Sequence, residues 1–182
     1  PLLGVHNVMN ALAAAAAAYA VGVGAAEIAR GLAAADAVGG RLKSRPGRAG
    51  SVIVDDSYNA NPASVRAALD YLAGLPGQRI LVLGDMAELG EQSSELHAEV
   101  GSYARGRCDR LLTIGVRSRA AARAFGGDGK AFDDLAALAA ALEPLLEPSA
   151  TVLIKGSRVM QLDRLVAALS SDEPAARGGA RC

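Results

Sequence analysis

The chain has 182 residues, 51% of them hydrophobic, and its 19 Lys and Arg balance its 19 Asp and Glu. This length suffices for one full domain and part of a second. Zero net charge leaves no basic excess for a nucleic-acid backbone or an anionic membrane, and the apolar content excludes disorder along most of the chain. The two cysteines, Cys108 and Cys182, cannot form a disulfide framework, so a reducing cytoplasm is the expected location.

The most apolar stretch covers residues 11–23. It is shorter than the roughly 20 residues that a membrane-spanning helix needs, and we expect a buried helix instead. The charged start and the cleavage site of a signal peptide are missing from it. The first residue is Pro1 rather than Met, so we expect the chain to begin inside a longer protein.

The first part of the chain is expected to be helical. Residues 6–20 consist mainly of alanine, the strongest helix former, and glycines follow where the helix would end. A second helix is expected over residues 25–35. Residues 38–50 are rich in Gly and Arg and contain one Pro, which predicts an irregular segment or an edge hairpin.

From residue 51 onward, aliphatic runs that predict strands alternate with segments of helical periodicity. The expected strands cover residues 51–54, 79–83, 110–114 and 151–154. The expected helices cover residues 62–73, 93–105, 117–124, 135–146 and 159–169. This alternation is typical of βαβ units, so we expect an α/β fold with a mainly parallel sheet flanked by helices.

Polar clusters follow three of the expected strands: DDSYNANP at residues 55–62, GDMAELG at residues 84–90 and KGSR at residues 155–158. Ligands of open α/β sheets bind at the carboxyl ends of the strands. These three loops are therefore the first candidates for a binding site.

Asp55 and Asp56 allow two interpretations. They could bind ribose hydroxyls, a metal ion or an ammonium group, or they could complement the positive end of the helix that follows. Asn61 is explained as the N-cap of that helix, with a proline at its first position. Tyr58 and Asn59 have no such structural explanation.

The KGSR segment has the composition of a small-anion site. Gly156 would let the backbone approach a ligand closely, the N–H groups of the next helix would face that ligand, and Lys155 and Arg158 would add positive charge. A carboxylate or a phosphate would fit. The alternative is an ordinary capped helix whose Lys and Arg are solvated.

His6, Asn7 and Asn10 stand at the start of the alanine-rich helix and can share one face of it. An asparagine amide can pair with the edge of adenine. The alternative is that Asn7 is only the N-cap of the helix. His97 lies between Glu95 and Glu99 and is expected to be a surface or half-buried residue.

Several motifs of catalysis are missing from the sequence: GxxxxGK[ST], HExxH, CxxC and GxSxG. GDMAELG is not a phosphate-binding GxGxxG loop either. The chain therefore lacks complete machinery for phosphate transfer.

Five segments taken in order resemble the C-terminal part of the Mur ligases: GVHNVMNALAAAAAA, GGRL, VDDSYNANPASVRAAL, LVLGDMAELGEQSSELH and LIKGSRVMQLDRLV. The YNANP, GDMAELG and KGSR forms resemble the MurF branch in particular. The family combines a domain that holds the UDP-sugar, a central ATPase domain and a Rossmann-like C-terminal domain. The resemblance implies that residues 1–48 are the helical end of the central domain, residues 49–170 the C-terminal domain and residues 171–182 a flexible tail.

The resemblance also implies an ATP-dependent peptide ligase of peptidoglycan precursor synthesis. ATP would phosphorylate the terminal carboxylate of a UDP-MurNAc-tripeptide, and the amine of D-alanyl-D-alanine would attack the acyl phosphate. The P-loop and the Mg²⁺ ligands would lie upstream, so the isolated chain is expected to be inactive. Its partners would be small molecules and neither nucleic acid nor membrane, and the protein would be a cytoplasmic monomer.

In that scheme His6, Asn7 and Asn10 match the HNxxNA motif that lines the adenine pocket for ATP. Arg41 and Asp56 match the catalytic arginine and aspartate that approach the ribose and the phosphates. No metal ligand is expected in this chain. The D-alanyl-D-alanine site would contain Tyr58, Asn59, Asn61, Lys155, Ser157 and Arg158.

Two other functions stay open from the sequence. One is another amide ligase that adds a single amino acid, as in folylpolyglutamate synthesis or other Mur steps, although the combination of DDSYNANP and KGSR argues against it. The other is a stand-alone module that binds a nucleotide or a dipeptide without catalysis, which the missing P-loop favours.

Overall fold

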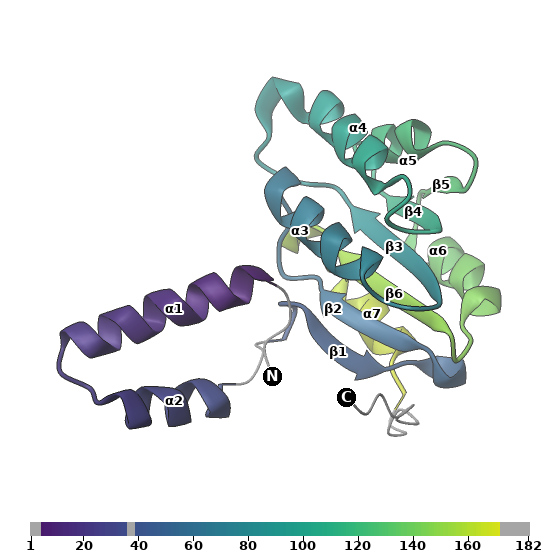
Figure 1. Cartoon of the computed structure of the whole chain (residues 1–182). Coiled ribbons are helices and arrows are strands. Elements are labelled where there is room, and N and C mark those ends of the chain that lie inside the picture. Colours follow the sequence, from purple (N-terminus) through teal and green to yellow (C-terminus); the bar gives the residue numbers. More distant parts are fainter. Residues whose placement is uncertain (1–4, 36–38, 172–182) are drawn as a thin grey trace.

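The computed structural model describes residues 5–35 and 39–171 of the chain. A hairpin of two helices, α1 (Val5–Ala20) and α2 (Ala25–Ala34), extends from an α/β part (Figure 1). Both helices lie where the sequence predicts them. Within the described residues, no helix is long and apolar enough to cross a membrane.

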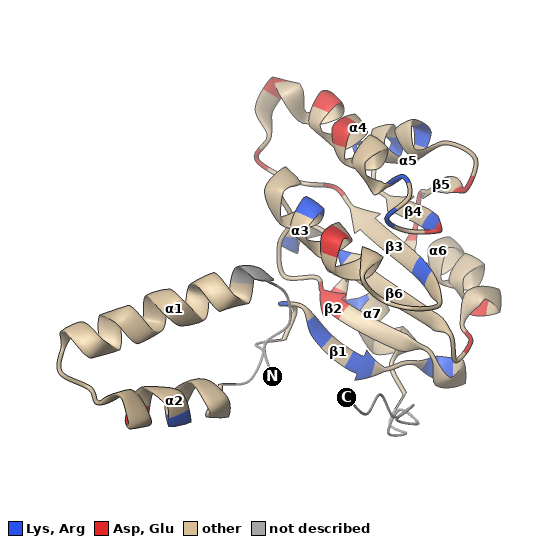
Figure 2. Cartoon of the chain, in the orientation of Figure 1, with Lys and Arg blue, Asp and Glu red and all other residues tan. Residues whose placement is uncertain are grey.

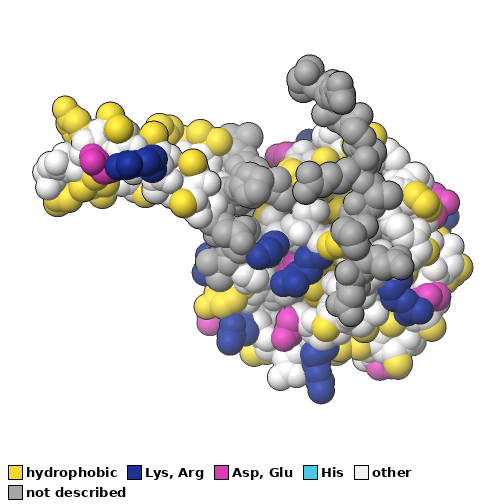
Figure 3. All heavy atoms as spheres, turned by 90° about the horizontal axis from the view of Figure 1, so that it is seen from below, with side chains coloured by type: hydrophobic (Ala, Val, Ile, Leu, Met, Phe, Trp, Pro, Cys, Tyr) yellow, Lys and Arg dark blue, Asp and Glu magenta, His cyan; other side chains and the backbone are white. Residues whose placement is uncertain are grey.

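The prediction that residues 11–23 are buried is wrong. Leu12 is 58% exposed, Tyr19 is 72% exposed and Val21 is 80% exposed. The reason is that α1 packs mainly against α2, which covers one side of it. The hairpin carries few charges (Figure 2), and hydrophobic side chains spread over its surface (Figure 3).

The α/β part is built on a six-stranded sheet with the order β1-β2-β6-β3-β4-β5. The strands are β1 (Lys43–Pro46), β2 (Val52–Asp56), β3 (Gln78–Gly84), β4 (Arg110–Ile114), β5 (Gly129–Phe132) and β6 (Ala150–Lys155). β1 runs antiparallel to β2, and all other neighbouring strands are parallel. The mainly parallel sheet predicted from the alternating pattern is confirmed.

Helices cover both faces of this sheet. One face packs against α3 (Pro62–Ala73), α4 (Ser93–Ala104) and α5 (Arg119–Phe125), and the other against α6 (Leu135–Leu142) and α7 (Asp163–Leu169). In β3, Leu81 and Leu83 face the first layer while Ile80 and Val82 face the second. Burial on both faces explains why these strands read as uninterrupted aliphatic runs.

Some elements differ from the expected ones. The segment before residue 51 forms the edge hairpin that was one of its two interpretations, because β1 pairs with β2. β5 was not predicted, since its sequence GKAF contains no β-branched residue. The last helix begins at Asp163 rather than at residue 159, because Gln161 takes a left-handed conformation with φ of 49°.

Two observations bear on the expected domain limits. The sheet begins at Lys43, before the expected boundary at residue 48. At the other end, the last described residue, Ser171, is bound to the sheet, because its N–H donates to the carbonyl oxygen of Pro46 at 3.0 Å. The rest of the expected tail lies outside the described residues.

Substitution of Gly101 by Ala should destabilise the protein. Substitution of an exposed helical glycine by alanine normally stabilises the helix by about 1 kcal/mol. At Gly101, however, the added Cβ would collide with the backbone oxygen of Ala121 in α5. We expect a loss of about 1–3 kcal/mol in the free energy of unfolding, measured with urea.

The matched control is Gly31→Ala, because a Cβ at Gly31 in α2 meets no atom within 4 Å. This variant should raise the helix content seen by circular dichroism. An unchanged or higher stability of Gly101→Ala would contradict the close packing of α4 on α5.

Candidate functional site

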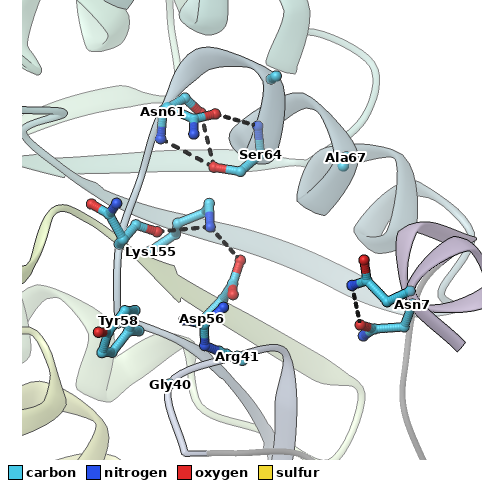
Figure 4. Close-up of a pocket in the computed structure, with 12 residues that line it drawn as sticks. Asn7, Gly40, Arg41, Asp56, Tyr58, Asn61, Ser64, Ala67 and Lys155 are labelled. Atoms are coloured by element: carbon cyan, nitrogen blue, oxygen red, sulfur yellow. Dashed lines mark hydrogen bonds and ion pairs between the residues drawn. The ribbon is translucent and has the colours of Figure 1, made fainter. Parts of the chain in front are cut away.

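A buried ion pair joins the ends of two neighbouring strands. Asp56 closes β2, Lys155 closes β6, and the two are partners in the parallel register. The Lys155 Nζ lies 2.6 Å from Asp56 Oδ2 and donates a second hydrogen bond of 3.0 Å to the backbone oxygen of Asn59 (Figure 4). Both side chains are almost fully buried. Of the ligands considered for Asp56, the structure supplies an ammonium group from the chain itself.

The two aspartates also hold the GGRL loop. Asp55 Oδ2 accepts the N–H of Gly40 at 3.0 Å, and Asp56 Oδ1 accepts the N–H of Leu42 at 3.2 Å. The carbonyl oxygen of Gly40 in turn accepts the N–H of Tyr58 at 3.0 Å. These bonds fix the loop on both sides of Arg41, so the position of this arginine is set by the strand end.

Gly40 is required in this loop for two reasons. Its φ is +76°, and a Cβ at this position would lie 3.0 Å from both the Cβ and the backbone nitrogen of Tyr58. A side chain here would separate the loop from the segment that follows β2.

A cavity of about 530 Å³ lies between α1, the GGRL loop and the start of α3. This volume is within the range of small-molecule sites. The cavity brings together residues that the sequence assigns to two different ligands. It is lined by Asn7, Asn10, Gly40, Arg41, Asp56, Tyr58, Asn59, Asn61, Ala63, Ser64, Ala67 and Lys155.

The asparagines of α1 contribute amide groups to this cavity. The Nδ2 of Asn10 donates to the Oδ1 of Asn7 at 3.2 Å. Because α1 begins at Val5, Asn7 lies inside the first turn, and its interpretation as the N-cap is wrong. The side chain of His6 lies outside the described residues.

The predicted role of Asn61 as N-cap of α3 is confirmed. Its Oδ1 accepts the N–H of Ser64 at 2.8 Å, and the Ser64 Oγ accepts the N–H of Asn61 at 3.1 Å. This capping box occupies the Asn61 side chain. The side-chain amide of Asn59 has no hydrogen-bond partner within the described part of the chain.

A second cavity of about 370 Å³ lies beside the KGSR loop. It shares a wall with the first cavity, formed by Tyr58, Asn59 and Asn61. The remaining lining residues are Ala60, Ala87, Glu88, Leu89, Ser157, Arg158 and Val159.

Ser157 is the most informative residue of the second cavity. Its side chain is buried, and its Oγ has no hydrogen-bond partner among the described residues. Its N–H donates to the backbone oxygen of Asp85 at 3.0 Å. A buried hydroxyl without a partner is unfavourable, so this geometry suits a ligand that completes the bond.

One expectation for the KGSR loop is wrong, and another residue of the loop has a structural role. Gly156 allows a close approach of Gly84, since a Cβ at Gly156 would lie 3.1 Å from the Gly84 Cα. No long helix follows directly, because Arg158–Met160 is a short 3-10 turn. Lys155 is occupied inside the protein, which leaves Arg158 as the exposed cation of the loop.

His97 is fully buried, and its expected place at or near the surface is wrong. Its Nε2 accepts the N–H of Met86 at 2.9 Å, and its Nδ1 lies 2.6 Å from the backbone oxygen of Ser93. This pattern fits a neutral imidazole that holds the GDMAELG loop. The sequence did contain a signal for this burial. His97 lies three residues before Val100 and seven before Ala104, a spacing that places all three on the buried face of one helix.

GDMAELG also fixes a neighbouring loop. Asp85 Oδ1 accepts the N–H groups of Ser118 at 2.7 Å and Arg117 at 3.1 Å. Over residues 5–35 and 39–171, no group of three or more His, Cys, Asp or Glu side chains could hold a metal ion.

Comparison with known proteins gives a consistent result. Residues 40–158 match the family model described as Mur ligase, glutamate ligase domain. The chain is 43% identical over 175 residues to the UDP-N-acetylmuramoyl-tripeptide–D-alanyl-D-alanine ligase of Escherichia coli strain K12. That alignment covers 94% of this chain and 38% of the relative.

Solved structures agree with the sequence relatives. A crystal structure of MurF from Acinetobacter baumannii has a TM-score of 0.84 and 36% identity, and the match covers 93% of this chain and 38% of that one. MurF ligase from Thermotoga maritima in complex with ADP has a TM-score of 0.79 and 26% identity, with 91% and 38% coverage. The chain thus spans 38% of the length of these relatives.

Substitution of Lys155 by Met should leave the Asp56 carboxylate buried without its cation. We expect a loss of about 3–5 kcal/mol in the free energy of unfolding, measured with a chemical denaturant. The double variant Asp56→Asn/Lys155→Met should recover part of this loss, because it removes both charges of the pair.

The matched control is Arg66→Met, which breaks the half-exposed ion pair between Arg66 and Glu99. It should reduce stability by less than about 1 kcal/mol. An equally small effect of Lys155→Met would contradict the closed ion pair.

Proposed function

This chain belongs to the Mur ligase family, and from that premise we propose that it is the C-terminal part of an ATP-dependent ligase. The ligase would join D-alanyl-D-alanine to a UDP-MurNAc-tripeptide in peptidoglycan precursor synthesis. The single observation that carries this proposal is the pair of cavities that share the wall of Tyr58, Asn59 and Asn61. The names of the relatives, which cover most of this chain, support the same activity.

The nucleotide would occupy the larger cavity. Amide groups of Asn7 and Asn10 are suited to the edge of adenine, with His6 as a further candidate. The Arg41 guanidinium forms no ion pair with a described residue and is available for a phosphate. Asp56 is bound to Lys155 and Leu42, so we propose that it acts by fixing the loop of Arg41.

The dipeptide would occupy the smaller cavity. D-alanyl-D-alanine carries a carboxylate, for which the unpartnered Ser157 hydroxyl is a suitable partner. The shared wall would let the amine face the larger cavity, where the acyl phosphate must form. Lys155 would act indirectly, since its ammonium group holds Asp56 and the backbone of Asn59.

The surface of the helical hairpin supports the proposal that it belongs to a larger, central domain. Its hydrophobic side chains are exposed, and exposed apolar patches usually mark an interface. We propose that residues 5–35 end the ATPase domain and that the C-terminal domain begins near residue 40, where the family model begins to match. The Mg²⁺ ligands and the P-loop would belong to the upstream part. A cytoplasmic location and a monomeric state remain part of the proposal.

The isolated chain should release no phosphate from ATP with Mg²⁺, UDP-MurNAc-tripeptide and D-alanyl-D-alanine, because its sequence contains no P-loop. Addition of the upstream portion of a related ligase should restore phosphate release that depends on the dipeptide. In that mixture, Arg41→Gln should reduce the rate by about 100-fold, since it removes a charge at the phosphates.

Two outcomes would contradict the proposed function. The first is phosphate release by the isolated chain above the level of its own Arg41→Gln variant, because the proposal places the P-loop in the upstream portion. A mixture that contains the folded chain and stays inactive would leave a binding module as the better description.

The Ser157→Ala variant should weaken D-alanyl-D-alanine binding by about tenfold. The measurement is a calorimetric titration of the mixture of this chain and the upstream portion of a related ligase. The free energy of unfolding should stay equal or rise, because the lost hydroxyl has no partner within the described residues. Thr113→Val is the matched control. Its Oγ1 is also buried without a described partner, but Thr113 lines neither cavity. Unchanged affinity in Ser157→Ala would place the dipeptide elsewhere.

A further inference from the structure

Two tyrosines of the described residues each lie beside two arginines. The ring centroid of Tyr103 lies 3.7 Å from the Cζ of Arg107 and 5.5 Å from that of Arg66. The ring centroid of Tyr58 lies 4.6 Å from the Cζ of Arg41 and 5.1 Å from that of Arg158. Both arrangements are cation–π contacts, but their charges are balanced differently.

At Tyr103 the positive charges are neutralised by the protein. Arg66 lies 2.9 Å from Glu99, and Arg107 lies 3.0 Å from Asp70. The Tyr103 hydroxyl donates to Asp70 at 2.8 Å. Two arginines and two carboxylates thus form a closed network between α3, α4 and the turn that follows α4, as expected of a structural contact.

At Tyr58 the charges remain uncompensated. Neither Arg41 nor Arg158 forms an ion pair with any acidic side chain of the described residues. The two carboxylates at the end of β2 already have partners, since Asp56 binds Lys155 and Asp55 lies 3.6 Å from Arg45. Two uncompensated guanidinium groups close to one half-exposed ring repel each other, and an anion in contact with both would offset this repulsion.

The backbone holds this arrangement in place. The N–H of Tyr58 donates to the oxygen of Gly40, so the ring is tied to the residue before Arg41. The parallel pairing of β2 and β6 brings Arg158 to the same strand ends. Tyr58 also lines both cavities. The ring therefore lies where the loop of Arg41 and the loop of Arg158 meet.

We infer that Tyr58 is a positioning residue that holds Arg41 and Arg158 together as one binding pair for a phosphoryl or pyrophosphoryl group. The contacts alone support the pair, while the identity of its natural anion rests on the proposed ligase function. In that function, the pair would connect the nucleotide cavity to the dipeptide cavity. Occupancy of one would then favour the ordering of the other.

The test is a titration of the ¹⁵N-labelled chain with inorganic pyrophosphate at low ionic strength, followed by the arginine Nε–H signals in NMR spectra. The variants Arg41→Gln and Arg158→Gln identify the two signals by their loss. We expect both signals to shift with one common Kd. The double variant should bind no more weakly than either single variant, because the two arginines act as a unit.

Changes of Tyr58 separate the ring from its hydroxyl. Tyr58→Phe keeps the aromatic face and should bind pyrophosphate within about twofold of the parent. Tyr58→Leu should weaken binding by about tenfold, as expected for the loss of two cation–π contacts. Tyr103→Leu is the matched control, because it removes a tyrosine with two arginines that are already neutralised, and it should leave the Kd unchanged.

Several results would overturn the inference. These are the absence of any shift, a shift of only one arginine signal, separate Kd values, multiplicative effects in the double variant, or equal losses in Tyr58→Phe and Tyr58→Leu. If Tyr58→Leu fails to fold, the Tyr58→Phe variant and the arginine variants still decide the question.

The outcome is independent of the ligase test. If the chain binds pyrophosphate through both arginines but supports no ligation in the reconstituted mixture, the inference of a binding pair holds and the proposed ligase function is wrong. If the mixture ligates but the two arginines act independently, the ligase function holds and the inference is wrong.

Discussion

The site depends on one buried ion pair, between Asp56 and Lys155. Each charge loses its hydration on burial, so each needs the other and further hydrogen bonds. The second oxygen of Asp56 holds the N–H of Leu42, and the ammonium group of Lys155 also holds the oxygen of Asn59. Through these bonds one pair fixes the GGRL, YNANP and KGSR segments at the same edge of the sheet. The shape of both cavities follows from this constraint.

The sequence predicts those parts of the fold that local interactions determine. The limits of α3 follow from the Asn61 cap and the proline after it, and β4 follows from a run of aliphatic residues. What was missed depends on distant contacts. β5 forms because it pairs with β4. The buried His97 is accommodated because the N–H of Met86 in the GDMAELG loop donates a hydrogen bond to it. The exposure of residues 11–23 is likewise a matter of what packs against them.

The candidate site shows the same division. Sequence motifs correctly indicated that polar residues gather at the strand ends, and the cavities contain most of the residues named. Their individual partners were not predictable, because Lys155 and Asp56 are 99 positions apart and the choice between an internal partner and a ligand depends on geometry. The pattern KGSR gives Lys155 and Arg158 equal weight, whereas burial separates them into an internal and an external cation.

The two strands that border the sheet, β1 and β5, are only four residues long. An open strand edge can pair with another molecule and begin aggregation. β1 carries Lys43, Arg45 and Pro46, and β5 carries the exposed Lys130. Charge repulsion and the missing N–H of proline both oppose such pairing. The sheet is thereby protected against edge-to-edge self-association at high protein concentration.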